Sequence, residues 1–325
     1  MTLDHHFDVA GTGFSCMDHI FTDGVLTATQ PGGSAGNVLW ALAKLGHAVA
    51  PVMRLGFDYH GGKIAADFAR AGADTSFIER DGHVRTPAIA ELLDTATGRH
   101  DFSFRNPLTG DGFPRYAPKL AHQLDTEDLG HLEHGRAAIS SCRAFYADRL
   151  NTDILAAFYV AASHGAMIVF EPSDIGDAQM LQEALELVTV LKISADRVTL
   201  QDVLGLDVPV PVIIETRGAD GLSVTAGGQT QAFPAIPAAA VVDTCGAGDM
   251  MTAGLVDWFL RQDIDLRLPR QGREPDVDRI GTEIAQIADG ILAGQALAAA
   301  NCAFAGARGY LAQMASRQEQ MAMEA

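Results

Sequence analysis

Cysteine is scarce in this chain, and its placement predicts neither a disulfide scaffold nor a zinc site. The four cysteines among the 325 residues are Cys16, Cys142, Cys245 and Cys302, and no two of them are close enough to form a CxxC pair. Disulfide-rich domains and structural zinc sites need such closely spaced cysteines. A chain of this length can bury a stable core without cross-links. We therefore expect a reducing compartment, the cytoplasm.

Basic residues are also few. Lysine and arginine number 23 against 41 aspartates and glutamates, which gives a formal net charge of −18. A surface of this sign repels nucleic-acid backbones and anionic membranes, so we expect neither as a partner. Any anionic ligand must then be held by local backbone groups and dipoles.

Long apolar runs are absent as well. The N-terminus lacks the basic start and the apolar run of a signal peptide. The most apolar late stretch, 290–305, is interrupted by Gly294, Gln295 and Asn301. It is therefore too polar to predict a membrane span.

Strand-like apolar runs instead alternate with alanine-rich helical stretches. Strands are predicted at 7–13, 49–55, 167–170 and 210–216, and helices at 35–45, 59–71, 154–163, 178–187, 247–260 and 280–305. Ser34 is expected to cap the helix at 35–45. The alternation predicts a single α/β domain over residues 1–325, in which helices cover both faces of a mainly parallel sheet.

Two segments depart from this alternation, at about 19–29 and 87–105. They are rich in Thr, Phe, Ile and Asp, and Phe102 and Phe104 show the two-residue period of a strand. We expect a small antiparallel sheet inserted into the α/β body, where it can serve as a lid over a cleft.

Two glycine-rich segments lack residues that nucleotide-binding loops require. Segment 11–13 (GTG) follows a strand, but Cys16 stands where a GxGxxG motif needs its last glycine. No suitable acidic residue follows about 20 residues later, as a dinucleotide site requires. Segment 56–63 has the wrong glycine spacing for a P-loop, and Ile64 replaces the required Ser or Thr.

A third segment, 243–249 (DTCGAGD), carries a stronger signal. The backbone N–H groups of Gly246, Ala247 and Gly248 can point at one anion, and the helix that follows adds roughly half a positive charge. Asp249 lies in the first turn of that helix, where a carboxylate can accept the proton of an attacking hydroxyl. From this segment alone, an aspartate that only stabilises a helix N-terminus is an equally good interpretation.

Four segments, in this order along the chain, resemble the ribokinase-like (PfkB) carbohydrate kinases. Residues 11–18 resemble the family's first strand, which ends in a substrate-binding aspartate, and 32–46 resemble its N-terminal signature. Residues 216–221 resemble its nucleotide loop, and 243–254 its C-terminal signature. The resemblance extends over about residues 7–309 and implies the ribokinase-like fold.

The resemblance implies an ATP-dependent kinase of a small sugar or sugar acid, fructose-like or 2-keto-3-deoxygluconate-like, with Mg²⁺ accompanying ATP. Asp249 maps onto the base, and the backbone of 246–248 onto the anion hole. Carbonyl groups of Asp243 and Cys245 map beside a monovalent cation such as K⁺. Many relatives pair through the lid, which implies a homodimer.

The resemblance also assigns binding residues. For the sugar these are Asp18, Gly33 and Asn37, with Arg105 reaching from the lid; for the nucleotide they are Ser194, Thr216, Gly218, Gly221 and Asn301. A surface arginine at Arg105, and an Asn301 that only bonds to neighbouring backbone, are the alternative interpretations.

One segment departs from the family pattern. An Asn-x-x-Glu sequence that organises metal and phosphates reads Ser194-Ala-Asp-Arg197 here, so a positive charge replaces a negative one. Asp196 and Glu171 are candidates for the missing carboxylate. A nucleoside kinase of the same fold and a catalytically weak sugar or nucleotide sensor are therefore the alternative functions.

Overall fold

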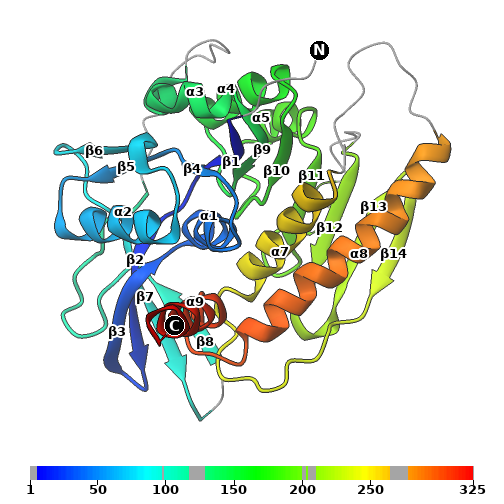
Figure 1. Ribbon diagram of the computed structural model, residues 1–325. Coiled ribbons are helices and arrows are strands. Elements are labelled where there is room, and N and C mark those ends of the chain that lie inside the picture. Colours follow the sequence, from blue (N-terminus) through cyan, green and yellow to red (C-terminus); the bar gives the residue numbers. More distant parts are fainter. Residues whose placement is uncertain are drawn as a thin grey trace.

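The computed structural model describes residues 6–96, 99–116, 129–199, 203, 210–263 and 277–324. Its main sheet consists of β1 (Phe7–Thr12), β4 (Val49–Pro51), β9 (Cys142–Ala147), β10 (Met167–Phe170), β11 (Val190–Ser194), β12 (Val212–Thr216), β13 (Leu222–Ala226) and β14 (Gln229–Phe233). The eight strands lie in the order β14-β13-β12-β11-β10-β9-β1-β4 (Figure 1). The six strands from β12 to β4 run parallel, and β13 and β14 add an antiparallel edge.

Helices cover both faces of this sheet, as predicted. The helices are α1 (Ser34–Lys44), α2 (Tyr59–Ala71), α3 (Arg136–Ile139), α4 (Thr152–Ser163), α5 (Ala178–Leu185), α7 (Ala247–Gln262), α8 (Val277–Asn301) and α9 (Gly309–Glu324), with short 3-10 turns at Thr75–Phe77, Gly130–Gly135 and Gly218–Asp220. Within the described ranges, no helix is long and apolar enough to cross a membrane.

Alternate side chains along each strand supply two separate cores. Val9 and Tyr146 pack in the cluster that contains the apolar residues of α1, α7 and α8. Their neighbours Ala10 and Phe145 pack in the cluster on the opposite face, with α3, α4 and α5. Parallel strands that are buried on both faces consist of continuous apolar runs, and such runs predicted strands of the main sheet from the sequence.

The start of α1 differs from the prediction, because Ser34 is the first helical residue and not the cap. Gly33 occupies the cap position with φ 84°, and a Cβ there would lie 2.5 Å from the carbonyl oxygen of Phe14. Only glycine fits such a left-handed, close contact. The carboxylate of Asp148 accepts a hydrogen bond from the backbone N–H of Ala35 at 3.1 Å, in place of a local cap.

The strand predicted at 49–55 is two strands in different sheets. β4 ends at Pro51, which has no N–H to continue the hydrogen-bond ladder. After Val52 the chain leaves the main sheet, and β5 (Met53–Gly56) pairs in parallel with β6 (Ile78–Asp81). The apolar run at 49–55 continues across the point where the chain passes from the main sheet to the two-stranded sheet, so its pattern did not indicate the change.

A separate four-stranded sheet corresponds to the predicted lid. It consists of β2 (Cys16–Thr22), β3 (Val25–Gly32), β7 (Ala88–Asp94) and β8 (Arg99–Ser103), in the order β3-β2-β7-β8, and it lies to one side of the main sheet (Figure 1). The prediction of an antiparallel sheet was wrong for its centre, because β2 and β7 are parallel. The long connection between them, which includes α1 and α2, permits a parallel pair.

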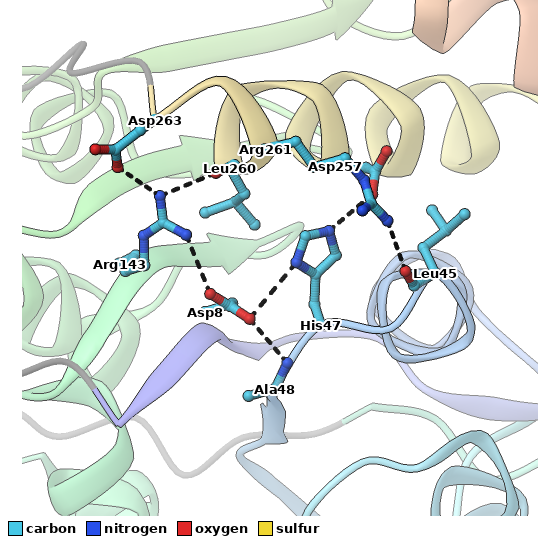
Figure 2. Close-up of polar contacts among 9 residues, drawn as sticks. All are labelled: Asp8, Leu45, His47, Ala48, Arg143, Asp257, Leu260, Arg261 and Asp263. Carbon is cyan, nitrogen blue, oxygen red and sulfur yellow. Dashed lines mark hydrogen bonds and ion pairs between the residues drawn. The ribbon is translucent and has the colours of Figure 1, made fainter.

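A polar junction of Asp8, His47 and Asp257 ties the C-terminal half of α7 to the start of β1 (Figure 2). Nε2 of His47 lies 2.8 Å from Oδ1 of Asp257, and its Nδ1 lies 3.6 Å from Oδ2 of Asp8. Arg261 donates to Asp257 at 2.7 Å and to the Leu45 carbonyl at 2.8 Å. The end of α7 is thereby joined to the loop that follows α1.

Arg143 of β9 extends this junction (Figure 2). Its guanidinium donates to Oδ1 of Asp8 at 3.2 Å, to the Leu260 carbonyl at 3.0 Å and to Oδ1 of Asp263 at 2.8 Å. The junction thus holds one end of α7 against two neighbouring strands, which fixes where the other end of the helix lies.

Asp257→Asn tests this junction through the pH dependence of stability. Burial alone would raise the pKa of Asp257, but hydrogen bonds from His47 and Arg261 outweigh it and lower that pKa. Because the folded-state pKa is depressed, the stabilisation is present above the unfolded value of about 3.9 and is lost as pH falls through the folded pKa. We expect Asp257→Asn to lower the free energy of unfolding by about 1 kcal/mol at pH 7, measured by urea denaturation.

The gap between Asp257→Asn and the wild type should narrow below about pH 4, where the wild-type carboxyl also becomes protonated. Asp263→Asn is the matched control, since that side chain is 93% exposed and should contribute little. A gap that stays constant from about pH 5 down to about pH 2 would show that the charge of Asp257 plays no part.

Candidate active site

The N-terminus of α7 begins in a left-handed glycine turn. Gly246 caps the helix with φ 70°, and its carbonyl accepts the N–H of Met250 at 2.8 Å. A Cβ on Gly246 would lie 2.5 Å from the Cβ of Ala307, so the turn also needs glycine for its close approach to the segment after α8. The first N–H groups of a helix have no acceptor within it, so this turn lies at the positive end of the helix dipole. In this structure the N–H of Ala247 donates to the Thr244 carbonyl at 3.2 Å.

Asp243 and Asn301 hold this turn in place. The Asp243 carboxylate accepts the N–H of Cys245 at 2.9 Å and that of Gly306 at 2.8 Å. Asn301 is fully buried, donates to the carbonyls of Cys245 and Gly306, and accepts the N–H of Tyr310 at 3.1 Å. Helix α8 ends at this asparagine, four residues before the predicted end at 305, because the chain turns there to support the loop.

Asp249 lies in the first turn of α7, as predicted, and is held from another helix. Nδ2 of Asn37, on α1, donates to Oδ2 of Asp249 at 2.7 Å. The two residues are 212 positions apart in the chain. The structure therefore brings together the residues that the two signatures contributed separately.

The surroundings of Asp249 disfavour its charged form. Burial, followed by the negative charge of Glu171, raises the pKa of Asp249 to about 7. The hydrogen bond from Asn37 and the positive charge of Lys192 oppose this rise, and Asp148 adds to it. A carboxylate with a pKa near neutrality can both accept and release a proton at physiological pH.

An ion pair beneath the helix N-terminus includes a residue that sequence analysis missed. Lys192 of β11 is 2% exposed, and its Nζ is hydrogen-bonded to Glu171. Nζ lies 3.6 Å from where a Cβ on Gly248 would stand, so the ammonium group is close to the glycine turn. Thr252 of α7 also donates to Glu171, at 2.8 Å. A lysine inside an apolar strand was the available signal, since buried lysines need a partner.

Acidic side chains converge on the lid side of Asp249. Asp18 of β2 is buried and accepts the thiol of Cys16 at 3.0 Å. Burial, with the negative charges of Glu91, Asp18, Asp243 and Asp249, raises the pKa of the Cys245 thiol well above its usual range. These carboxylates therefore act together on Cys245. Glu91, on β7 next to β2, was not predicted, because only the lid pairing brings it here.

The predicted nucleotide residues lie at the carboxyl ends of two neighbouring strands. Ser194 of β11 and Thr216 of β12 are paired in register, and the Thr216 hydroxyl donates to the Ile193 carbonyl at 3.2 Å. Gly218 and Gly221 follow Thr216 in a turn where both have positive φ. Ligands of open α/β sheets bind at this edge.

Arg105 stands apart from these groups. It is exposed, lies in the loop after β8, and donates to the Gly110 carbonyl at 3.1 Å. Within the described part of the chain, it makes no hydrogen bond or ion pair to Asp18, Asn37 or Asp249.

No ready-made metal cluster accompanies this arrangement in the described residues. In these ranges, no group of three or more His, Cys, Asp or Glu side chains is placed to hold a metal ion. Asp196 and Arg197, from the divergent segment, are both exposed, whereas Glu171 is half-buried beside Asp249.

The sequence and the fold are similar to those of known carbohydrate kinases. A fructokinase from Klebsiella pneumoniae is 27% identical over 244 residues, which cover 70% of this chain and 76% of the relative. The crystal structure of a fructokinase with bound ATP from Xylella fastidiosa has a TM-score of 0.67 at 21% identity and covers 94% of both chains. A double-mutant fructokinase from Vibrio cholerae, bound to fructose, ADP and potassium, has a TM-score of 0.67 at 19% identity, over 95% of this chain and 96% of that chain.

The family model of the pfkB carbohydrate kinases matches residues 27–308, from the middle of β3 to the turn before α9. The match spans both signatures, the glycine turn and Asp249. The chain therefore belongs to the pfkB family of carbohydrate kinases and is a sugar phosphotransferase.

Proposed function

We propose that this enzyme transfers the γ-phosphoryl group of ATP to a hydroxymethyl group of a free sugar or sugar acid, of the fructose or 2-keto-3-deoxygluconate type, with Asp249 as the base. The observation that carries the proposal is the half-buried Asp249 carboxylate in the first turn of α7, beside the glycine turn. The base and a ready anion site thus adjoin, as an in-line transfer requires.

In this mechanism the sugar hydroxyl passes its proton to Asp249 as its oxygen forms a bond to the γ-phosphorus. The bond from that phosphorus to the bridging oxygen breaks, and ADP leaves. The N–H groups of 246–248 and the helix dipole stabilise the charge on the transferred group. Asp18, Gly33 and Asn37 hold the sugar. With the lid in the conformation of this structure, the exposed position of Arg105 does not support a contact with the sugar.

For the nucleotide, we propose contacts with Ser194, Thr216, Gly218 and Gly221. Asn301 has a different role in this proposal, because its amide is buried and already bonded to the loop that it supports. Magnesium bound with the nucleotide would neutralise the charge of the phosphates, and it would need only one or two protein carboxylates. We propose Glu171, which is half-buried, as one of them.

A monovalent cation such as K⁺ is proposed beside the glycine turn, at the carbonyls of Asp243 and Cys245. The potassium-bound fructokinase of the same fold supports this proposal. The cation would add positive charge next to the anion site.

A homodimer through the lid is the assembly we propose. The two outer strands of the lid sheet, β3 and β8, carry the exposed apolar side chains Val25, Leu26 and Phe102. Exposed strand edges of this kind pair readily with a second chain.

The acceptor and the base are tested together by ADP release from MgATP with sugars, sugar acids and nucleosides, each with and without K⁺. We expect turnover with a sugar or sugar acid. Asp249→Asn should lower kcat by about 100- to 10,000-fold, because an amide cannot accept the proton. Asp263→Asn, at the exposed far end of α7, is the control and should retain activity.

Turnover with nucleosides alone would contradict the sugar assignment. Saturable sugar binding without turnover would instead indicate a sensor. Full activity in Asp249→Asn would remove Asp249 as the base.

The pH dependence of kcat/KM reports the protonation of Asp249 in the free enzyme. Only the deprotonated carboxylate can act as the base, and its pKa is raised to about 7. We expect kcat/KM to fall by about tenfold per pH unit below that pKa and to level off above it. A profile that is flat from pH 8 down to pH 5 would contradict this assignment.

Light scattering after size exclusion tests the dimer. We expect the wild type to have twice the mass of one chain, and Val25→Glu to shift it to the monomer, because a buried unpaired charge opposes association. Leu292→Glu, on α8 outside the lid, replaces another exposed apolar side chain and should leave the mass unchanged. A monomeric wild type would contradict the proposal.

A further inference from the structure

Arg308 is a buried cation that none of the predicted motifs includes. It lies in the turn between α8 and α9, and its guanidinium is buried in the interior. Burial lowers its pKa, whereas the carboxylates of Asp67, Asp18 and Asp249 act in the opposite direction. A buried charge of this kind is costly unless it is paired and hydrogen-bonded.

The guanidinium bridges two helices. Its Nη1 donates to Oδ2 of Asp67, on α2, at 2.6 Å. Its Nε donates to Oδ1 of Asn37, on α1, at 2.7 Å. The carbon of the guanidinium also lies 5.1 Å from the ring centroid of Trp40, one helical turn after Asn37. Three contacts therefore fix the position of this side chain.

The bond from Arg308 determines how the Asn37 amide is oriented. An asparagine side chain has an acceptor oxygen and a donor NH₂ group on opposite sides. Because arginine can only donate, Oδ1 of Asn37 must face Arg308. Nδ2 then faces Asp249, to which it donates at 2.7 Å. Hydrogen bonds thus connect Asp67, Arg308, Asn37 and Asp249 in that order, and we call this chain the relay.

The same turn supports the glycine turn at the start of α7. Ala307 packs where a Cβ on Gly246 would otherwise stand, and the N–H of Gly306 is bonded to Asp243. Consecutive residues 306–308 therefore contact both the anion site and the relay to the carboxylate.

We propose that Arg308 is a positioning residue for phosphoryl transfer, which orients the Asn37 amide so that it holds the Asp249 carboxylate toward the reacting hydroxyl. This inference rests on the proposed role of Asp249 as the base. In this proposal Arg308 acts through Asn37.

Arg308→Met, which keeps an unbranched apolar side chain and removes the guanidinium donors, tests this inference. We expect kcat to fall by about 10- to 100-fold through misplacement of the base, with KM for ATP changed less than about threefold. The acid limb of kcat/KM should move to higher pH, because the hydrogen bond from Asn37 lowers the pKa of Asp249. Glu171, Lys192 and Asp148 are unchanged in this variant. Loss of the Arg308 charge, which also acts on Asp249 directly, moves the pKa in the same direction. The shift therefore supports positioning only if Asn37→Ala abolishes it.

A double-mutant cycle separates positioning from general destabilisation. In an Asn37→Ala background, Arg308→Met should lower kcat by less than about twofold, because the relay is already broken. Arg54→Met, which removes a largely buried arginine paired with Asp81 in another sheet, is the matched control. It should lower stability without moving the acid limb.

Two further measurements keep the test decisive. If Arg308→Met does not fold, Asp67→Ala removes the far partner of Arg308 and should move the acid limb in the same direction. The ¹³C NMR titration of the Asp249 carboxyl, assigned with Asp249→Asn, should show a raised pKa in Arg308→Met or Asp67→Ala whether or not the enzyme turns over.

Loss of the proposed function would appear as no ADP release from any sugar, or as full activity in Asp249→Asn. The Arg308 inference is then decided by the NMR titration of Asp67→Ala, because direct loss of that negative charge would lower the Asp249 pKa and only misplacement of the Asn37 amide would raise it. An Asp249 pKa that is unchanged in the folded variants, or effects of Arg308→Met and Asn37→Ala on kcat that simply multiply, would overturn it.

Discussion

The hydrogen bond between Asn37 and Asp249 is the contact on which the site depends. It joins α1 and α7, which come from distant parts of the chain, and it acts on a carboxylate that burial and Glu171 would otherwise keep protonated. Its direction is set by Arg308, and the other end of α7 is held by the junction around His47. The fold thus holds the Asp249 carboxylate in place through contacts from several elements. Preorganised sites stabilise developing charge in this way, without rearranging.

The acidity of the chain shapes the rest of the site. With a net charge of −18, the protein offers phosphate no general attraction. Two local positive features compensate, namely the N–H groups at the start of α7 and the buried Lys192 beneath them. Glu171 pairs with that lysine and also raises the pKa of Asp249, so one carboxylate links the proposed anion site to the proposed base.

Local features were predictable from the sequence. The glycine turn, the first-turn position of Asp249 and the alternation of strands and helices follow from short-range rules. Lys192, Glu91 and Arg308 escaped prediction because their roles arise from contacts between distant elements. The run at 49–55 was misread for a related reason, since Pro51 ends one ladder while the apolar pattern continues. The parallel pairing of β2 with β7 likewise depends on a long connection and not on either strand's own sequence.

A crystal structure with the preferred sugar and a non-hydrolysable ATP analogue tests the central claim most directly. The account predicts that the acceptor hydroxyl lies within hydrogen-bond distance of the Asp249 carboxylate. It also predicts that the terminal phosphate contacts the N–H groups of 246–248 and that Asn37 still donates to Asp249. A hydroxyl bound to another side chain, with Asp249 turned away from it, would contradict the account.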